Sequence, residues 1–199
     1  MKQLLITGFD PFGGASVNPA WEAVKALPDE IGAYAVTKQQ IPTIFGCAAE
    51  AVLNAADRMT SPPDVILCIG QAGGRAAVTP EFAAINYRHA SIPDNAGCII
   101  QDSPVIPGAP AAYFATVPVH AMTAAIQAVG LCAKTSYSAG TFVCNDVLYS
   151  LLHRFSGTAV RVGFIHVPFL PEQVSDAAAP SMSLADMVRA LTAAVTALP

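Results

Sequence analysis

The chain has 199 residues, of which 53% are hydrophobic and 12% charged, and its formal net charge is −4 at pH 7. This length favours a single domain spanning residues 1–199 that buries a sizeable core. The charged fraction is about half of the roughly 25% that is usual, which predicts a sheet buried on both faces and a subunit interface, so we expect a homo-oligomer. The acidic balance and the lack of a basic cluster argue against nucleic acid as a partner.

Neither a secretory segment nor a membrane span is expected. The apolar run at the N-terminus is too short for a signal peptide. Residues 103–133 carry no Asp, Glu, Lys or Arg, but four prolines break that segment and argue against a lipid-exposed helix. The five cysteines include no C-x-x-C pair, so the sequence indicates neither a disulfide framework nor a metal site, and a reducing cytoplasm fits.

The first half of the chain alternates between strands and helices. Residues 2–9 form a short apolar strand, and a glycine-rich loop then leads to Asn18 and Pro19, a helix cap and a first-turn proline. That loop lacks the G-x-G-x-x-G and Gly-Lys-Ser/Thr spacings, so we exclude a nucleotide site. The further elements expected here are a helix to about residue 27, a strand at 34–41, a helix at 45–59 and a strand at 64–70.

The second half continues the alternation. The expected elements are a strand-like segment at 78–88, a proline-rich loop or small hairpin up to residue 118, a helix at 120–129, a strand at 135–139, a helix that begins at or just after Cys144, a strand at 161–167 and a last helix at 183–198. Strands that alternate with helices from end to end predict an α/β fold, an α/β/α sandwich with a mainly parallel central sheet.

Cys144 is the candidate nucleophile. Apolar residues recur after it at the spacing of an amphipathic helix, and Asn145 and Asp146 suit a first helical turn. Free N–H groups at a helix start favour a thiolate, so we expect the pKa of Cys144 to lie below the free value of about 8.5. We also expect Cys144 alone among the cysteines to combine access with a helix N-terminus. A buried structural cysteine is the alternative, and position does not decide between the two.

His166 and Glu81 are the candidate base and the residue that orients it, two groups that a cysteine nucleophile needs. His166 ends an apolar strand, and the Cys144 helix also starts from a strand's carboxyl end, so the two can meet at one edge of the sheet. Glu81 stands in an uncharged neighbourhood. The alternatives are a core imidazole satisfied by one hydrogen bond and a solvated glutamate at a sheet edge, and spacing does not exclude them.

Six groups of residues carry a more specific pattern, in a fixed order from about residue 3 to residue 173. They are Gly8-Phe9-Asp10-Pro11-Phe12-Gly13-Gly14 with Asn18-Pro19; Gly70-Gln71-Ala72-Gly73-Gly74-Arg75; Glu81 with Ala84-Ile85-Asn86; Ile92-Pro93-Asp94-Asn95; Gly140-Thr141-Phe142-Val143-Cys144-Asn145; and His166-Val167-Pro168 with Pro171-Glu172-Gln173. Together they resemble the pyroglutamyl peptidase I (pyrrolidone-carboxylate peptidase) family of cysteine peptidases.

The resemblance implies a cytoplasmic enzyme that removes an N-terminal pyroglutamyl residue from peptides, without a cofactor or metal, as a homo-oligomer (a dimer or a tetramer). It implies a triad of Cys144, His166 and Glu81, and a pocket for the flat, uncharged lactam ring. Such a ring suits aromatic faces and a few fixed hydrogen-bonding groups. The positions that match the family's pocket are Phe9, Phe12, Asn18, Gln71, Ile92, Phe142 and Val143.

Two positions depart from the family pattern. Phe82 stands where the family usually carries Arg directly after the glutamate, and Ser91 stands where it carries Arg before Ile-Pro-Asp-Asn. The family arginine would steady negative charge on the reacting carbonyl, which serine cannot do. The alternative function is therefore a catalytically impaired relative that binds pyroglutamyl termini with little turnover. Arg88 is the nearest substitute, but three residues away on an extended chain it is expected to point to the opposite face.

Overall fold

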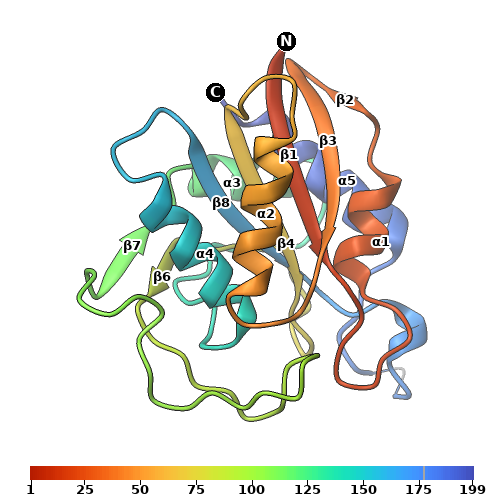
Figure 1. Cartoon of the computed structure of the whole chain (residues 1–199). Coiled ribbons are helices and arrows are strands. Elements are labelled where there is room, and N and C mark those ends of the chain that lie inside the picture. The colour runs from red at the N-terminus through yellow and green to blue at the C-terminus, as the bar shows by residue number, and fades with distance from the viewer. Residues whose placement is uncertain (177) are drawn as a thin grey trace.

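The computed structural model describes residues 1–176 and 178–199, and a six-stranded sheet forms its centre (Figure 1). Across the sheet the strands are β2 (Glu30–Ile31), β3 (Tyr34–Ile41), β1 (Lys2–Phe9), β4 (Val65–Gln71), β8 (Arg161–Val167) and β5 (Thr79–Pro80). The inner strands β3, β1, β4 and β8 are parallel, whereas β2 and β5 pair antiparallel at the two edges. The predicted mainly parallel sheet is therefore confirmed.

Helices cover both faces of this sheet. Nearly every residue of β1, β4 and β8 is buried, and a parallel strand of this kind needs cover on both sides. One layer consists of α1 (Pro19–Ala26), α3 (Val119–Ala128) and α5 (Leu184–Thr196), and the other of α2 (Cys47–Asp57) and α4 (Val143–Arg154). In Figure 1, α2 and α4 lie in front of the sheet and α3 and α5 behind it. The predicted sandwich is confirmed.

The alternation of side chains along a strand decides which layer each residue faces. Ile69 of β4 packs into the core on the side of α1, α3 and α5, whereas Phe164 of β8 packs on the side of α2 and α4. His166 lies two residues beyond Phe164, so it faces α4. Gln71 lies two residues beyond Ile69, so it faces the opposite layer.

Three shorter elements complete the fold. They are β6 (Ala83–Ile85), β7 (Ala112–Phe114) and the 3₁₀ helix η1 (Pro171–Gln173). β6 and β7 pair antiparallel as a separate two-stranded sheet, so the proline-rich stretch contains one strand of a small hairpin. The single strand-like segment expected at 78–88 is instead divided between β5 and β6.

The strand expected at residues 135–139 is wrong. Residues 133–136 run beside residues 78–81 and are joined to them only by two isolated bridges, Val78 with Ala133 and Glu81 with Ser136. The Ser136 N–H donates to the Pro80 carbonyl, but Pro80 has no N–H to donate to the carbonyl of Lys134. A proline at an edge therefore breaks a ladder that the residue pattern alone suggested. The short edge strand β2 was not expected either, because two residues show no periodicity.

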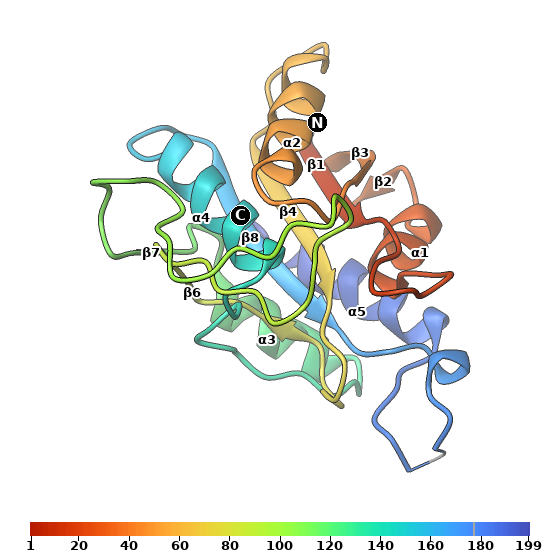
Figure 2. The same ribbon diagram turned by 60° about the horizontal axis from the view of Figure 1, so that its bottom comes forward.

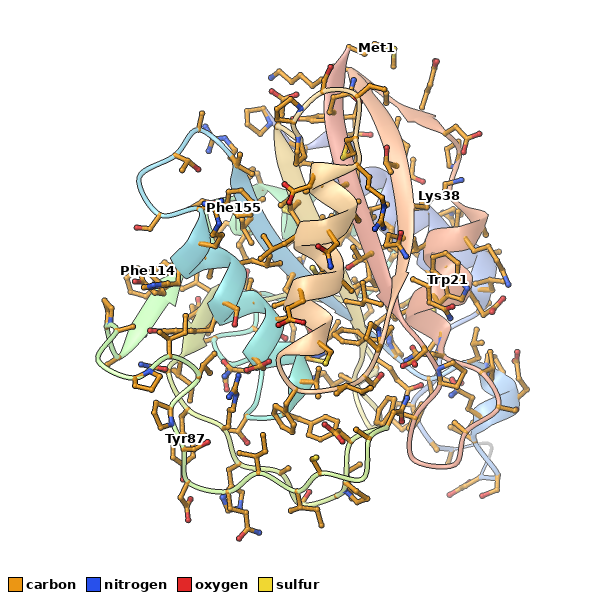
Figure 3. The ribbon with its side chains drawn as sticks, in the orientation of Figure 1. Met1, Trp21, Lys38, Tyr87, Phe114 and Phe155 are labelled. Carbon is orange, nitrogen blue, oxygen red and sulfur yellow. The ribbon has the colours of Figure 1, made fainter. Side chains whose placement is uncertain are left out.

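The loops at the carboxyl ends of the parallel strands gather at one end of the molecule. Figure 2, in which that end comes forward, shows the loops after β1, β4 and β8 together with the long connection between β6 and β7. Tyr87, labelled in Figure 3, lies in that connection. Ligands of parallel α/β sheets bind at this end. None of the described helices is long and apolar enough to cross a membrane.

Candidate active site

Cys144 is the second residue of α4, so the expected helix N-terminus is confirmed. Its sulfur lies against the carboxyl end of β4, because a Cβ built on Gly70 would be 3.1 Å from Cys144 Sγ and 2.7 Å from the Phe164 ring. Only glycine fits at position 70. Gly70 pairs with His166 across β4 and β8, so the thiol and the imidazole lie at the same point of the sheet, as predicted.

His166 and Glu81 form a buried hydrogen-bonded pair. Nδ1 of His166 lies 2.7 Å from Oε1 of Glu81, and the two side chains are 4% and 0% exposed. The alternative of a solvated glutamate is therefore wrong. Because a carboxylate accepts the hydrogen bond at Nδ1, that nitrogen carries the proton and Nε2 keeps a free lone pair. Nε2 is the atom that can act as a base.

Arg75 belongs to the same group, although no role was predicted for it. Its Nη1 lies 2.8 Å from Oε1 of Glu81 and 2.6 Å from Oγ1 of Thr79. The Arg75 side chain is 29% exposed and so separates the buried carboxylate from solvent. The sequence contains one indication that Arg75 pairs with Glu81, because Arg75 is the only charged residue between Gln71 and Glu81.

The pKa values of both groups are lowered, which favours the charged form of Glu81 and the neutral form of His166. Burial would raise the pKa of Glu81, but hydrogen bonds outweigh it and the pKa lies below its ordinary value. These bonds come from His166, at 2.7 Å, and from Arg75, at 2.8 Å. Burial lowers the pKa of His166, and the charge of Arg75 lowers it further against the raising effect of Glu81. At neutral pH Glu81 is thus ionised and His166 is neutral, which suits an orienting carboxylate and a base.

The lowered pKa expected for Cys144 is wrong. Burial raises the pKa of this thiol to about 12, and the charge on Glu81 and the neighbouring thiol of Cys68 add to the shift. The charge of Arg75 and a hydrogen bond from the backbone at the helix start lower the pKa again, but only in part. The resting thiol is therefore protonated, and a base must remove its proton during the reaction.

Cys144 is also not the only cysteine at a helix start. Cys47 is the first residue of α2 and is exposed, whereas Cys144 is only partly exposed. What distinguishes Cys144 is its neighbours, Gly70, His166 and Glu81. Within residues 1–176 and 178–199 no group of three His, Cys, Asp or Glu side chains is placed to hold a metal ion.

Phenylalanine rings gather beside the start of α4. The rings of Phe12 and Phe142 are 6.2 Å apart, and Phe45 meets Phe142 edge-on at 5.3 Å. Phe12 and Phe142 are half-buried and so offer ring surface to a flat ligand. Phe45 was missed, since nothing marks it apart from ordinary core. Phe9 and Val143 are buried in the core and expose almost no side-chain surface that a substrate could contact.

An open groove of about 750 Å³ lies at the same end of the sheet. Its lining consists of residues 12–17, Gln71, Ile92, Phe169, Glu172 and Gln173. Three predicted pocket residues, Phe12, Gln71 and Ile92, therefore share one cavity. Asn18 does not line it. The Asn18 side chain caps α1 by accepting from the Ala20 N–H and donates to the Asp10 carbonyl, so its contact with a lactam stays a prediction.

Arg88 is bound at the start of α4, whereas Ser91 is exposed. Nη2 of Arg88 lies 2.5 Å from Oδ1 of the buried Asp146, in the first turn of α4, and its guanidinium lies 5.8 Å from the centre of the Phe45 ring. Oδ2 of Asp146 also accepts from the Gly46 N–H. Arg88 is therefore committed to Asp146 and does not replace the cation that Ser91 lacks.

A cysteine beside a buried imidazole–carboxylate pair, at the carboxyl end of a parallel sheet, defines a class of protein: cysteine hydrolases on an α/β scaffold. The family model of the pyroglutamyl peptidases, Peptidase_C15, matches residues 2–199. The chain belongs to this family, and it is a hydrolase of the pyroglutamyl peptidase I type.

Full-length relatives agree with this assignment. The pyrrolidone-carboxylate peptidase of Levilactobacillus brevis is 52% identical and covers 98% of this chain and 97% of its own length. That of Bacillus subtilis is 48% identical, with 98% and 92% covered. The crystal structure of Bacillus amyloliquefaciens pyroglutamyl peptidase I superposes with a TM-score of 0.94 at 42% identity, covering 100% of this chain and 97% of that one. These similarities do not favour the alternative of an impaired relative.

Proposed function

We propose that residues 1–199 form one catalytic domain that releases an N-terminal pyroglutamyl residue from peptides, with Cys144, His166 and Glu81 as its triad. The observation that carries the proposal is the buried His166–Glu81 hydrogen bond next to the sulfur of Cys144. Membership of the pyroglutamyl peptidase family supplies the substrate class.

The first step is acylation of the cysteine. Sγ of Cys144 attacks the carbonyl carbon that joins pyroglutamate to the next residue. Because the pKa of the thiol is about 12, its proton passes to Nε2 of His166 while the C–S bond forms. Nδ1 of His166 remains bonded to Glu81, so the carboxylate stabilises the imidazolium.

The remaining steps reverse the proton transfer. The C–N bond breaks as the imidazolium of His166 protonates the leaving amine, which leaves a pyroglutamyl thioester on Cys144. His166 then takes a proton from water, whose oxygen adds to the thioester carbonyl. The C–S bond breaks, and free pyroglutamate and the protonated thiol result.

Backbone N–H groups at the start of α4 are our candidates for stabilising the oxyanion. Phe142, the N-cap residue, makes no side-chain capping bond, so it does not occupy these donors. The Cys144 N–H lies nearest the reacting sulfur, and the positive end of the helix dipole adds to it. Ser91 supplies no charge and Arg88 is bound to Asp146, so we assign the role to the backbone.

We further propose that the protein acts in the cytoplasm without a cofactor, as a dimer or tetramer. The low charged fraction of 12% supports a subunit interface. Free cysteines at all five positions fit a reducing compartment.

A comparison of three fluorogenic amides tests the proposed activity. We expect turnover of a pyroglutamyl amide and little turnover of the matching prolyl and glutaminyl amides, because only the first carries a neutral lactam. No turnover of the pyroglutamyl amide, or equal turnover of all three, would contradict the proposal.

A further inference from the structure

Three segments that are far apart in the chain meet at one wall of the groove, at Val17, Gln71 and Gln173. The Leu170 N–H donates to Oε1 of Gln173 over 2.9 Å. Nε2 of Gln173 lies 3.0 Å from Oε1 of Gln71 and 3.3 Å from the carbonyl oxygen of Val17. Gln173 therefore connects the loop before α1, the end of β4 and the turn after β8.

These contacts allow only one orientation of each amide. The Leu170 N–H can only donate, so the Gln173 atom that it meets must be the oxygen. The NH₂ group of Gln173 then faces the Val17 carbonyl, which can only accept. The same NH₂ group meets Gln71, so the Gln71 atom there must also be its oxygen. The two N–H donors of Gln71 are left to face elsewhere.

Gln173 is itself held in place by its own turn. It ends η1, which Pro171 begins, and its backbone N–H donates to the carbonyl of Leu170 over 3.0 Å. Leu170 is 3% exposed, so the turn is anchored in the core. Because both the backbone and the side-chain oxygen of Gln173 are fixed, its NH₂ group has a defined position against Gln71.

We infer that Gln173 is a positioning residue for substrate specificity: it orients the Gln71 amide so that its NH₂ group donates to the ring carbonyl of the substrate. This inference rests on the proposed function and deepens it. A pyroglutamyl ring carries a carbonyl oxygen, which accepts such a donor. A prolyl ring has a methylene group there and a cationic nitrogen, which would favour an oxygen instead.

The test reverses the orientation of Gln71 without changing the size of residue 173. In Gln173→Glu the carboxylate still accepts from the Leu170 N–H but cannot donate to Gln71. The Gln71 amide then turns its NH₂ group to the carboxylate and its oxygen to the ring. We expect kcat/KM for a pyroglutamyl amide to fall about tenfold to a hundredfold, mainly through KM. The ratio of pyroglutamyl to prolyl turnover should fall with it.

Two further variants separate this effect from charge and from folding. Gln40→Glu makes the same change of charge on the exposed part of β3 and should leave the ratio unchanged. Gln173→Met removes the donors without adding charge, and it should lower the ratio less than Gln173→Glu because the Gln71 amide becomes free rather than reversed. Thermal melting shows whether each variant is folded.

A double-mutant cycle decides whether Gln173 acts through Gln71. In a Gln71→Ala background, Gln173→Glu should cause no further loss of the ratio, since no amide remains to be turned. Additive losses, or an unchanged ratio in folded Gln173→Glu and Gln173→Met, would overturn the inference while the proposed function stands. Absence of pyroglutamyl turnover in the unsubstituted protein would overturn both.

Discussion

The proposed catalytic group and the groove lie at the same end of the sheet but are built in different ways. Cys144 stands at a helix start, His166 in a strand and Glu81 directly after a strand. Glu81 and His166 are buried, and Cys144 is partly exposed. Phe12 and Ile92 of the groove lie on loops, and Ile92 is 42% exposed. The proposed triad is therefore held mainly by regular elements, whereas the groove is formed in part by loops that side-chain hydrogen bonds hold in place.

The largest expected effect is on the catalytic side of this comparison. Cys144→Ser should lower kcat on the order of 10⁵-fold or more, because the hydroxyl is a much weaker nucleophile at this site. The fold should remain, since serine is nearly isosteric with cysteine. Cys132→Ser is the matched control at an exposed cysteine and should keep full activity. Activity retained in Cys144→Ser would remove it from the triad.

Removing Arg88 should lower the stability of the fold around the start of α4 and should not remove a group that takes part in the proposed reaction. Arg88→Ala leaves Asp146 as a buried carboxylate without its cation, which should lower the free energy of unfolding by about 3–5 kcal/mol. Urea denaturation measures the change. The control is Arg189→Ala, whose ion pair with Asp186 is exposed and should contribute less than about 1 kcal/mol. Equal losses in both variants would mean that burial of Asp146 does not matter.

Arg75 lies between the buried His166–Glu81 pair and solvent, so its replacement tests how the surroundings of the pair set the pKa of His166. In Arg75→Met, Glu81 loses a hydrogen bond and His166 loses the cation that lowers its pKa. The pKa of His166 should then rise. Because kcat/KM falls at low pH as this base becomes protonated, the acidic limb of the pH profile should move to higher pH. At neutral pH the loss should be about tenfold to a hundredfold.

Arg75→Lys is the control for this prediction. It keeps the positive charge near Glu81, so the acidic limb should stay close to that of the unsubstituted protein even if geometry lowers the rate. A limb that moves in Arg75→Lys as far as in Arg75→Met would show that hydrogen-bond geometry, not charge, sets the pKa of the base.

The same division describes what the sequence could predict. The places of Cys144 at a helix start and of His166 in a strand could be predicted because periodicity locates helix starts and strand ends, and parallel strands bring such ends together. The burial of Glu81 could not be read from its position, because β5 is short and the parallel neighbour that covers it is not a regular strand. The wrong pKa direction for Cys144 has the same origin: the helix start is visible in the sequence, but the depth of burial is not.

The groove was less predictable, for a different reason. Its hydrogen bonds join residues far apart in the chain, such as Gln71 and Gln173, and no local pattern reveals such pairs. The resemblance to the family named Gln71 and Ile92, and the structure adds what holds Gln71. For Asn18 the local sequence predicted a different role correctly: its place before Pro19 indicates a helix cap, and Asn18 caps α1.

The smallest effect is expected at Ser91, where an exposed side chain stands near the catalytic end. Ser91→Arg should raise kcat by several-fold, up to about tenfold, and leave KM nearly unchanged, because a cation would act on charge that develops only in the transition state. Solvent weakens an exposed charge, so the gain should shrink in high salt. Ser91→Gln adds length without charge and should leave kcat unchanged. If Ser91→Arg and Ser91→Gln have the same kcat, a cation at position 91 does not help to stabilise the oxyanion, and the backbone donors at the start of α4 suffice.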